Sequence, residues 1–152
     1  ETSDTRAAGT LTVEEAAKAA DIFDNIMDFP EGFATMIGER GITLSGGQKQ
    51  RISIARALIK QPNVLVLDDS LSAVDTATEK QIQQNLDEVL AGKTAIIITH
   101  RIFSLIHFDN ILVLDDGIIA EQGTHEQLLK AGGIYADIYE KQLHEQTEEE
   151  TV

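Results

Sequence analysis

The first 32 residues divide into a polar lead-in and an amphipathic segment. Residues 1–12 are mostly small and polar, and they predict a flexible lead-in. From Val13 to Met27, apolar side chains recur at three- and four-residue spacings, the period of a helix with one buried face. The sequence Asp28–Gly32 is expected to end this helix, because proline cannot continue it and glycine permits a tight turn.

A second helix is predicted from about Gly46 to Lys60. Ser45 and Gln48 have the spacing of a capping box, in which the two residues satisfy each other's backbone N–H groups. Pro62 is expected to close the helix. Its apolar face consists of Ile52, Ala55, Leu58 and Ile59.

Val64–Leu67 is a continuous apolar run, which is typical of a strand buried on both faces, and Thr94–Thr99 is predicted as a second buried strand. Between them, a helix is expected to start at a cap formed by Asp75 or Thr76 and to end at Gly92. A strand, a helix and a strand in this order predict a βαβ unit with parallel strands.

The last part of the chain predicts a hairpin followed by helices. Ile111–Leu114 and Ile118–Glu121 flank Asp115-Asp116-Gly117, a strong turn signal between two strands. The closing segments are predicted as two helices and a solvated acidic tail: Thr124–Lys130, Ile134–Leu143 and Glu145–Glu150.

Acidic residues outnumber basic ones by 26 to 12 in this 152-residue chain, so the formal net charge is −14 with histidine neutral. Such a surface repels phosphate, which argues against nucleic acid or an anionic lipid surface as a partner. Apolar residues make up 42% of the chain and can build a core, which is aliphatic because aromatics are only 5%. The absence of cysteine excludes disulfides and thiolate metal sites. A soluble, intracellular α/β chain is expected.

Polar side chains follow both predicted strands, at the edge where ligands bind in open parallel sheets. Asp68 at the tip of the first strand suits Mg²⁺ held through one of its bound waters, because this hard cation prefers oxygen ligands and keeps water. Asp69 could orient or deprotonate a water, and His100 could bond a terminal phosphate or that water. The alternative for each residue alone is structural: the two aspartates cap a strand, and His100 begins a loop.

The sequence Ser45-Gly46-Gly47 stands at the start of a predicted helix. Exposed backbone N–H groups, absent side chains and the positive end of the helix dipole favour an anion there. Taken alone, this tripeptide is also explained by an ordinary serine cap followed by glycines.

The combination of motifs is more specific than any one of them. Leu44–Gln48, Val64–Asp69, Ser72–Asp75 and Thr99-His100 occur in one order at compact spacing. This arrangement resembles the nucleotide-binding domain of ATP-binding cassette (ABC) transporters, of the exporter type with fused membrane and nucleotide domains. Further matches are Gly38–Gly41, which is similar to the exporter X-loop, and the C-terminal segments Leu114–Gly117, Gly123–Glu126 and Gly133–Tyr135. The resemblance covers roughly residues 13–143.

The resemblance implies a P-loop NTPase-like (RecA-like) α/β fold with a partial parallel sheet and an ABC helical subdomain. The implied segments are a lead-in (1–12), a helical subdomain (13–60), a later part of the RecA-like core (61–133) and a C-terminal helix with an acidic tail (134–152). The implied cofactors are ATP and Mg²⁺.

Site residues carry over at matching positions. Ser45, Gly46, Gly47 and Gln48 would form the signature motif, which contacts the γ-phosphate of ATP held by the opposite subunit. Asp68 would be the Walker B aspartate that holds Mg²⁺ through water. Asp75 would be the D-loop aspartate at the dimer interface, and His100 the switch histidine.

One departure from the family is the phosphate loop. A Walker A motif needs G-x-x-x-x-G-K-[ST], and Gly41 to Gly46 has the glycine spacing without the Lys-Ser or Lys-Thr that should follow. The upstream Q-loop and the adenine-stacking aromatic are missing as well. We therefore expect this chain to be the C-terminal portion of the domain, inactive alone, with an N-terminal half and membrane helices supplied by other sequence.

The second departure is Asp69, where the family usually has a catalytic glutamate. Aspartate is one methylene shorter, so its carboxylate retreats by about 1.5 Å. A displacement near 1 Å can cost on the order of a hundredfold in rate.

Two functions follow from these observations. The leading hypothesis is the C-terminal part of an exporter ATPase domain, which couples ATP hydrolysis at a homo- or heterodimer of such domains to transport, at the cytoplasmic face of the cell membrane. The alternative is a non-catalytic domain of a heterodimer that binds ATP and completes a partner's site with its signature motif. A third reading, an ABC head from chromosome maintenance, is disfavoured because no heptad repeat is present.

Overall fold

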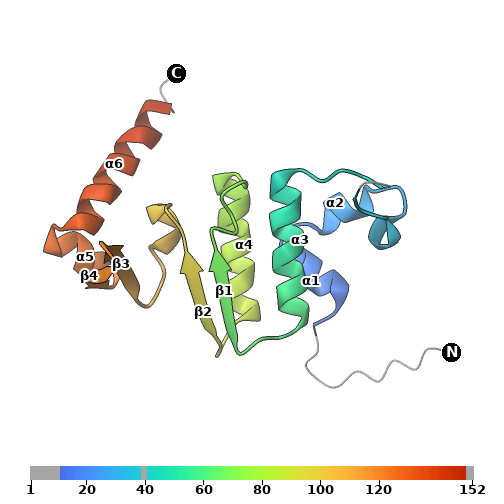
Figure 1. Cartoon of the computed structure of the whole chain (residues 1–152), viewed down its shortest axis with the longest axis horizontal. Coiled ribbons are helices and arrows are strands. Elements are labelled where there is room, and N and C mark those ends of the chain that lie inside the picture. The colour runs from blue at the N-terminus through green and yellow to red at the C-terminus, as the bar shows by residue number, and fades with distance from the viewer. Residues whose placement is uncertain (1–10, 39–40, 150–152) are drawn as a thin grey trace. The chain divides into compact units, whose positions relative to one another are not determined.

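The computed structural model describes residues 11–38 and 41–149, and these form two compact units. The first unit ends at Ile98 and the second begins at Thr99. In the first unit, helices pack on one face of a small parallel sheet, whereas the second unit is built from a hairpin and two helices (Figure 1).

The predicted first helix is two helices, so the prediction of one continuous helix is wrong. They are α1 (Val13–Ala19) and α2 (Phe23–Met27). The chain turns between them at Asp21, whose φ is +52°. Asp21 N–H donates to the Lys18 carbonyl at 3.0 Å and Ile22 N–H to the Ala17 carbonyl at 2.9 Å, which is the Schellman pattern of a helix end. The buried Ile22 continues the apolar face of α1 beyond the turn, so the apolar spacing in the sequence does not reveal the break.

Helix α3 (Gly46–Ile59) confirms the prediction for this segment. Gln48 N–H donates to Ser45 Oγ at 3.2 Å, and Ser45 N–H donates to Gln48 Oε1 at 2.9 Å, so the capping box forms as expected. The buried Ile54 and Leu58 of α3 contribute to the core of the first unit.

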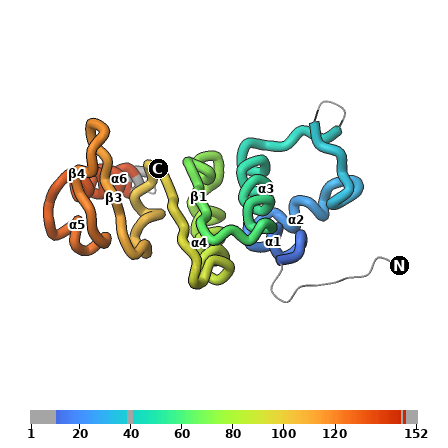
Figure 2. The backbone as a smooth tube through the Cα atoms, turned by 60° about the horizontal axis from the view of Figure 1, so that its bottom comes forward, coloured from blue at the N-terminus to red at the C-terminus, as the bar shows by residue number. Residues whose placement is uncertain are grey.

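The βαβ unit is also confirmed. Strands β1 (Val64–Asp68) and β2 (Thr94–Ile98) are parallel, with Val64 opposite Thr94 and Asp68 opposite Ile98. Helix α4 (Thr76–Val89) connects them, and Asp75 is its cap. In Figures 1 and 2, β1 lies beside α4 and α3 lies beside α1.

Only one face of this sheet is buried within the described residues. Leu65 and Leu67 of β1 pack with α3 and α4 in the aliphatic core. On the other face, the exposed side-chain fractions are Val64 53%, Val66 55%, Ile96 49% and Ile98 50%. The prediction of strands buried on both faces is therefore wrong for this part of the chain, because its helices cover one side alone.

The second unit contains the predicted hairpin. Strands β3 (Ile111–Asp115) and β4 (Ile118–Gly123) are antiparallel. The two residues between them, Asp116 and Gly117, have φ of +47° and +79°, as a tight type I′ hairpin turn requires.

The two closing helices of the second unit are α5 (His125–Ala131) and α6 (Ile134–Glu149). Helix α6 continues beyond the predicted end at Leu143, so the acidic segment remains helical to Glu149. A single 3₁₀ turn spans Ile102–Leu105, and the 3₁₀ turn of the first unit spans Gly32–Ala34. The buried core of the second unit is formed by Ile102, Ile111, Leu128 and Tyr135.

Among the described residues, every helix is too short or too polar to cross a lipid bilayer.

Candidate functional site

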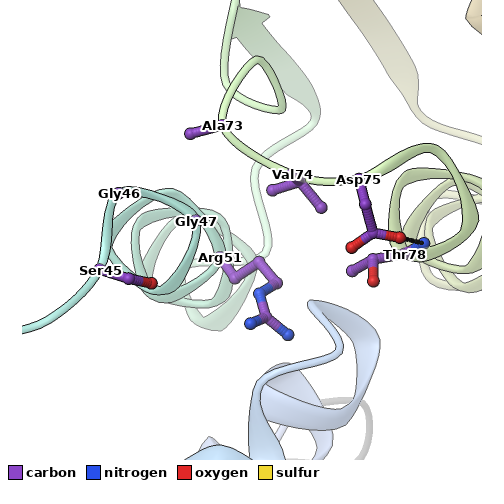
Figure 3. Close-up of a pocket in the computed structure, with 8 residues that line it drawn as sticks. All are labelled: Ser45, Gly46, Gly47, Arg51, Ala73, Val74, Asp75 and Thr78. Carbon is purple, nitrogen blue, oxygen red and sulfur yellow. Dashed lines mark hydrogen bonds between the residues drawn. The ribbon is translucent and has the colours of Figure 1, made fainter.

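The first turns of α3, the segment between β1 and α4 and the start of α4 line an open pocket of about 270 Å³ (Figure 3). The pocket brings together four of the residues that the sequence singled out: Ser45, Gly46, Gly47 and Asp75. Its remaining lining residues are Arg51, Ala73, Val74 and Thr78. The signature and D-loop candidates of one chain are therefore neighbours.

Gly47 permits this close approach. A Cβ atom built at Gly47 would lie 2.9 Å from the carbonyl oxygen of Ala73, closer than side-chain carbons come to such atoms. A Cβ at Gly46 would lie 3.3 Å from the Ala73 Cβ, a tight but milder contact. The glycine pair thus lets the first turn of α3 pack directly against the loop that follows β1.

The start of α3 retains the properties of an anion site. Backbone N–H groups in the first turn of a helix have no acceptor within the helix, and the dipole is positive there. Gln48 is committed to the capping box through both its backbone N–H and its side-chain oxygen. Ser45 Oγ accepts the Gln48 N–H, and its hydroxyl donates to no group among the described residues. Of the four signature candidates, Ser45, Gly46 and Gly47 fit an anion best.

Arg51 places a positive charge in the pocket. Its guanidinium donates to the carbonyl oxygen of Asp21, and its Nη1 lies 3.6 Å from the Asp21 carboxylate. This residue is not among those that the sequence motifs pointed to. One signal was available, because Arg51 lies four residues after Gly47 and hence on the same side of the helix.

Asp75 has a structural task in the pocket. Its carboxylate accepts the Thr78 backbone N–H at 3.0 Å and caps α4 (Figure 3). Hydrogen bonds from the Thr78 backbone, and then from the Thr78 side chain, hold the pKa of Asp75 below its usual value. The carboxylate is therefore charged at neutral pH.

Asp68 is the last residue of β1 and Asp69 follows the strand, and both side chains are exposed. Asp69 N–H donates to the Ile98 carbonyl at 2.9 Å, and Asp69 then turns the chain with φ of +46°. This left-handed region is uncommon for residues with side chains, and aspartate is among those that enter it most readily. The direction in which the Asp69 side chain leaves the backbone therefore depends on this uncommon conformation.

The carboxylates at the end of β1 fit Mg²⁺ in a limited way. No cluster of three or more acidic or histidine ligands occurs among the described residues. Mg²⁺ commonly uses one or two protein carboxylates and completes its shell with water and substrate phosphates. Asp68 could hold such an ion through one of its bound waters.

His100 belongs to the second unit, and its side chain is exposed. Its carbonyl oxygen accepts the Gln142 Nε2 at 2.6 Å, and Ile102 N–H donates to Gln142 Oε1 at 2.9 Å. The backbone that carries this histidine is therefore held by α6.

Gln50 is the residue that sequence reasoning missed most clearly. Its side-chain amide bonds the backbone of Asp69 and Ala73 and the hydroxyl of Ser72. Its spacing was a signal, because Gln50 lies one helical turn after Gly46 and Gly47.

Two other predicted motifs are partly visible. In the X-loop candidate, Glu39 and Arg40 lie outside the described residues, and Ile37 and Ile42 form a bridge on either side of them. In the C-terminal motif, the His125 Nδ1 lies 2.9 Å from the hydroxyl of the buried Tyr135. His125 thus ties α5 to α6.

Comparison with known proteins agrees with this geometry. A family model described as ABC transporter matches residues 2–72. The human protein "ATP-binding cassette sub-family B member 6" is 50% identical over 145 residues, 95% of this chain and 17% of its own length. The Bacillus subtilis protein "Uncharacterized ABC transporter ATP-binding protein YknU" is 53% identical over 133 residues, 88% of this chain and 23% of its own. The chain belongs to the ABC transporter nucleotide-binding domain family.

A solved structure supports the same assignment in three dimensions. The "Structure of a bacterial Atm1-family ABC exporter with ATP bound" matches with a TM-score of 0.82 and 45% identity, over 91% of this chain and 24% of that one. The predicted P-loop NTPase-like α/β fold with its ABC helical subdomain is confirmed. This ABC chain spans less than a quarter of the length of the relatives named above.

Proposed function

We propose that this chain forms the signature, Walker B, D-loop and switch-histidine part of an exporter ATPase domain. The observation that carries the proposal is the pocket at the start of α3, where Ser45, Gly46 and Gly47 meet the Asp75 segment. In this proposal, the helical subdomain comprises residues 13–60 and the later part of the RecA-like core comprises residues 61–133.

The partners and cofactors follow from the domain type. The complete site would form between two nucleotide-binding domains, with the γ-phosphate of ATP at the Ser45 hydroxyl and the Gly46 and Gly47 amides of the opposite domain. The phosphate-binding lysine would come from sequence outside these 152 residues, since no window here carries it. Transmembrane domains of the exporter would receive the motion at the cytoplasmic face of the cell membrane.

The chemistry would be an in-line attack of water on the γ-phosphorus. The bond from phosphorus to the bridging oxygen breaks, so that ADP and phosphate leave, and Asp69 receives the proton of the attacking water. His100 would hold the water or a γ-phosphate oxygen. Mg²⁺ at Asp68 would neutralise phosphate charge when bound. The amides of Gly46 and Gly47 and the hydroxyl of Ser45 would donate to oxygens on which charge develops, since the Ser45 amide is used in the capping box.

The test is ATP turnover by the reconstituted full-length transporter. Asp69→Glu is expected to raise kcat, because the longer side chain extends the carboxylate by about 1.5 Å, one carbon–carbon bond. His100→Ala should reduce turnover strongly. Unchanged turnover in both variants would remove Asp69 and His100 from the chemistry.

A second function is favoured specifically by aspartate at position 69. A domain that binds ATP without hydrolysing it would still complete the partner's site with its own Ser45–Gly47. In that case His100→Ala leaves total activity nearly intact, whereas Ser45→Arg abolishes it. The two variants together therefore separate a catalytic from a non-catalytic role.

A further inference from the structure

We infer that Gln50 is a positioning residue that fastens the start of α3 to the backbone of Asp69. Through it, a displacement of the phosphate-facing glycines would be transmitted to the carboxylate at the end of β1. The inference rests on the proposed function and adds a mechanical connection within one chain.

Both the oxygen and the nitrogen of the Gln50 side-chain amide form hydrogen bonds. Its Oε1 accepts the Ala73 backbone N–H at 2.9 Å. Its Nε2 donates to Ser72 Oγ at 2.9 Å and to the Asp69 carbonyl oxygen at 3.3 Å. One side chain of α3 therefore binds the beginning and the end of the segment from Asp69 to Ala73.

These bonds hold a residue in an uncommon conformation. Asp69 has φ of +46°, and such a backbone persists when its surroundings determine it. On one side, Asp69 N–H is bound by the Ile98 carbonyl. On the other side, its carbonyl accepts from Gln50 Nε2 and from Ser72 Oγ, the latter at 3.0 Å. Removal of Gln50 withdraws the hydrogen bond that the Asp69 carbonyl accepts from α3, and leaves the bond from Ser72 within the turn.

The contact continues to the glycine pair. Gly46, Gly47 and Gln50 lie on one side of α3, and that side faces Ala73. Helical turns are stiff, so a ligand that shifts the glycines also shifts Gln50 and the segment bonded to it. In the proposed dimer, the glycines serve one ATP and Asp69 serves the other, so Gln50 would link the two sites.

The experiment compares Gln50→Leu with Gln84→Leu in the full-length transporter. Gln84 is an exposed glutamine of α4 and provides the matched control. Gln50→Leu should lower kcat for ATP at least about tenfold, since a displacement near 1 Å can cost on the order of a hundredfold. The KM for ATP should change by less than about twofold, because the phosphate-binding groups themselves remain.

Gln50→Glu distinguishes the role of the amide oxygen from that of the amide nitrogen. It is also the variant to measure if Gln50→Leu does not fold. It keeps an acceptor for Ala73 N–H but loses the donor to the Asp69 carbonyl. Its kcat should fall as in Gln50→Leu. Hydrogen exchange of peptides covering residues 69–75 should accelerate in both variants and remain at the wild-type rate in Gln84→Leu.

A double-mutant cycle with Ser72→Ala completes the test. Because Gln50 and Ser72 share the Asp69 carbonyl, their effects on kcat should be strongly non-additive. Additive effects, or kcat and exchange in the Gln50 variants equal to those of Gln84→Leu, would overturn the inference. Absence of ATP turnover in the wild-type transporter would instead overturn the proposed function.

Discussion

At Gly47 the backbone of α3 comes so close to the Ala73 carbonyl that there is no room for a methyl group. The Asp69 backbone, a few residues before Ala73, adopts a left-handed conformation that aspartate tolerates. Both positions depend on single-residue properties, namely an absent side chain and a permissive backbone. The family resemblance pointed to both residues. The physical reason why glycine stands at one position and aspartate at the other is visible only in the contacts of the folded chain.

We expect Gly47→Ala to destabilise the first unit by about 1–3 kcal/mol, as overpacking typically does. The added Cβ would meet a backbone oxygen, which cannot rotate away. Urea unfolding measures the loss. The matched control is Gly46→Ala, whose Cβ would meet a side-chain carbon at 3.3 Å and should cost less. Equal losses in the two variants would contradict the close approach at Gly47.

Asp75 should make the stability of the folded chain depend on pH, with a sign that follows from its lowered pKa. Hydrogen bonds from Thr78 lower the pKa of this carboxylate in the folded chain, so its contribution to stability is fully present above the unfolded pKa. That contribution should be lost as pH falls below about 3.8, through the lower folded pKa. Thermal unfolding of the wild type and Asp75→Asn between pH 6 and about 2.5 measures it. The difference between the two proteins should shrink with acid, and a constant difference would contradict the assigned cause.

At the scale of elements, helix ends decide most of the architecture. Three of the helices that the structure describes begin with capping boxes, at Thr12, Ser45 and Thr124, and such boxes are visible in sequence because their partners lie three residues apart. The break at Asp21 was not visible, because the apolar spacing continues across it. Helix α6 is a different case, since its start is satisfied by a residue from another element.

That residue is Glu121 of β4, whose two carboxylate oxygens accept the N–H groups of Ile134 and Tyr135 at 3.0 and 2.8 Å. Gly133 leaves space for this carboxylate, because a Cβ there would overlap Glu121. We expect Glu121→Ala to destabilise the second unit by about 1–2 kcal/mol, as loss of a helix cap does.

Hydrogen exchange along α6 measures this effect, which should be largest in the first turn. Glu140→Ala removes an exposed carboxylate from the same helix and is the control. Comparable exchange in the two variants would show that Glu121 does not hold the start of α6.

At the scale of the whole molecule, the exposed face of β1 and β2 stands out. Val64, Val66, Ile96 and Ile98 form an apolar surface next to the aspartates at the strand end. Surfaces of this kind on sheets promote association with other chains.

The 152-residue chain is therefore expected to self-associate and to bind a hydrophobic dye. Val66→Lys combined with Ile98→Lys should reduce both effects, because charges on this face oppose stacking. Analytical ultracentrifugation and dye fluorescence provide the measurements. The control is Met36→Lys, at an exposed apolar residue outside the sheet. Equal self-association in the double variant and the control would assign the behaviour to another surface.

Local patterns were sufficient for most elements and for the family. Capping boxes, the βαβ order, the hairpin turn at Asp116-Gly117 and the ordered motifs depend on residues close together in the chain, so they can be recognised without coordinates. Ser45, Gly46, Gly47 and Asp75 were found in this way, and the structure places them around one pocket.

Other features depended on contacts between distant segments. Gln50 reaches residues 19 to 23 positions away, and Asn85 of α4 reaches the Lys18 carbonyl across 67 positions. Which strand face is covered, and which glycine lacks room for a side chain, also depends on segments remote in sequence. Hydrophobic spacing specifies that a face is to be buried, whereas only the packed chain specifies which groups meet there, because those contacts form between elements that the sequence separates.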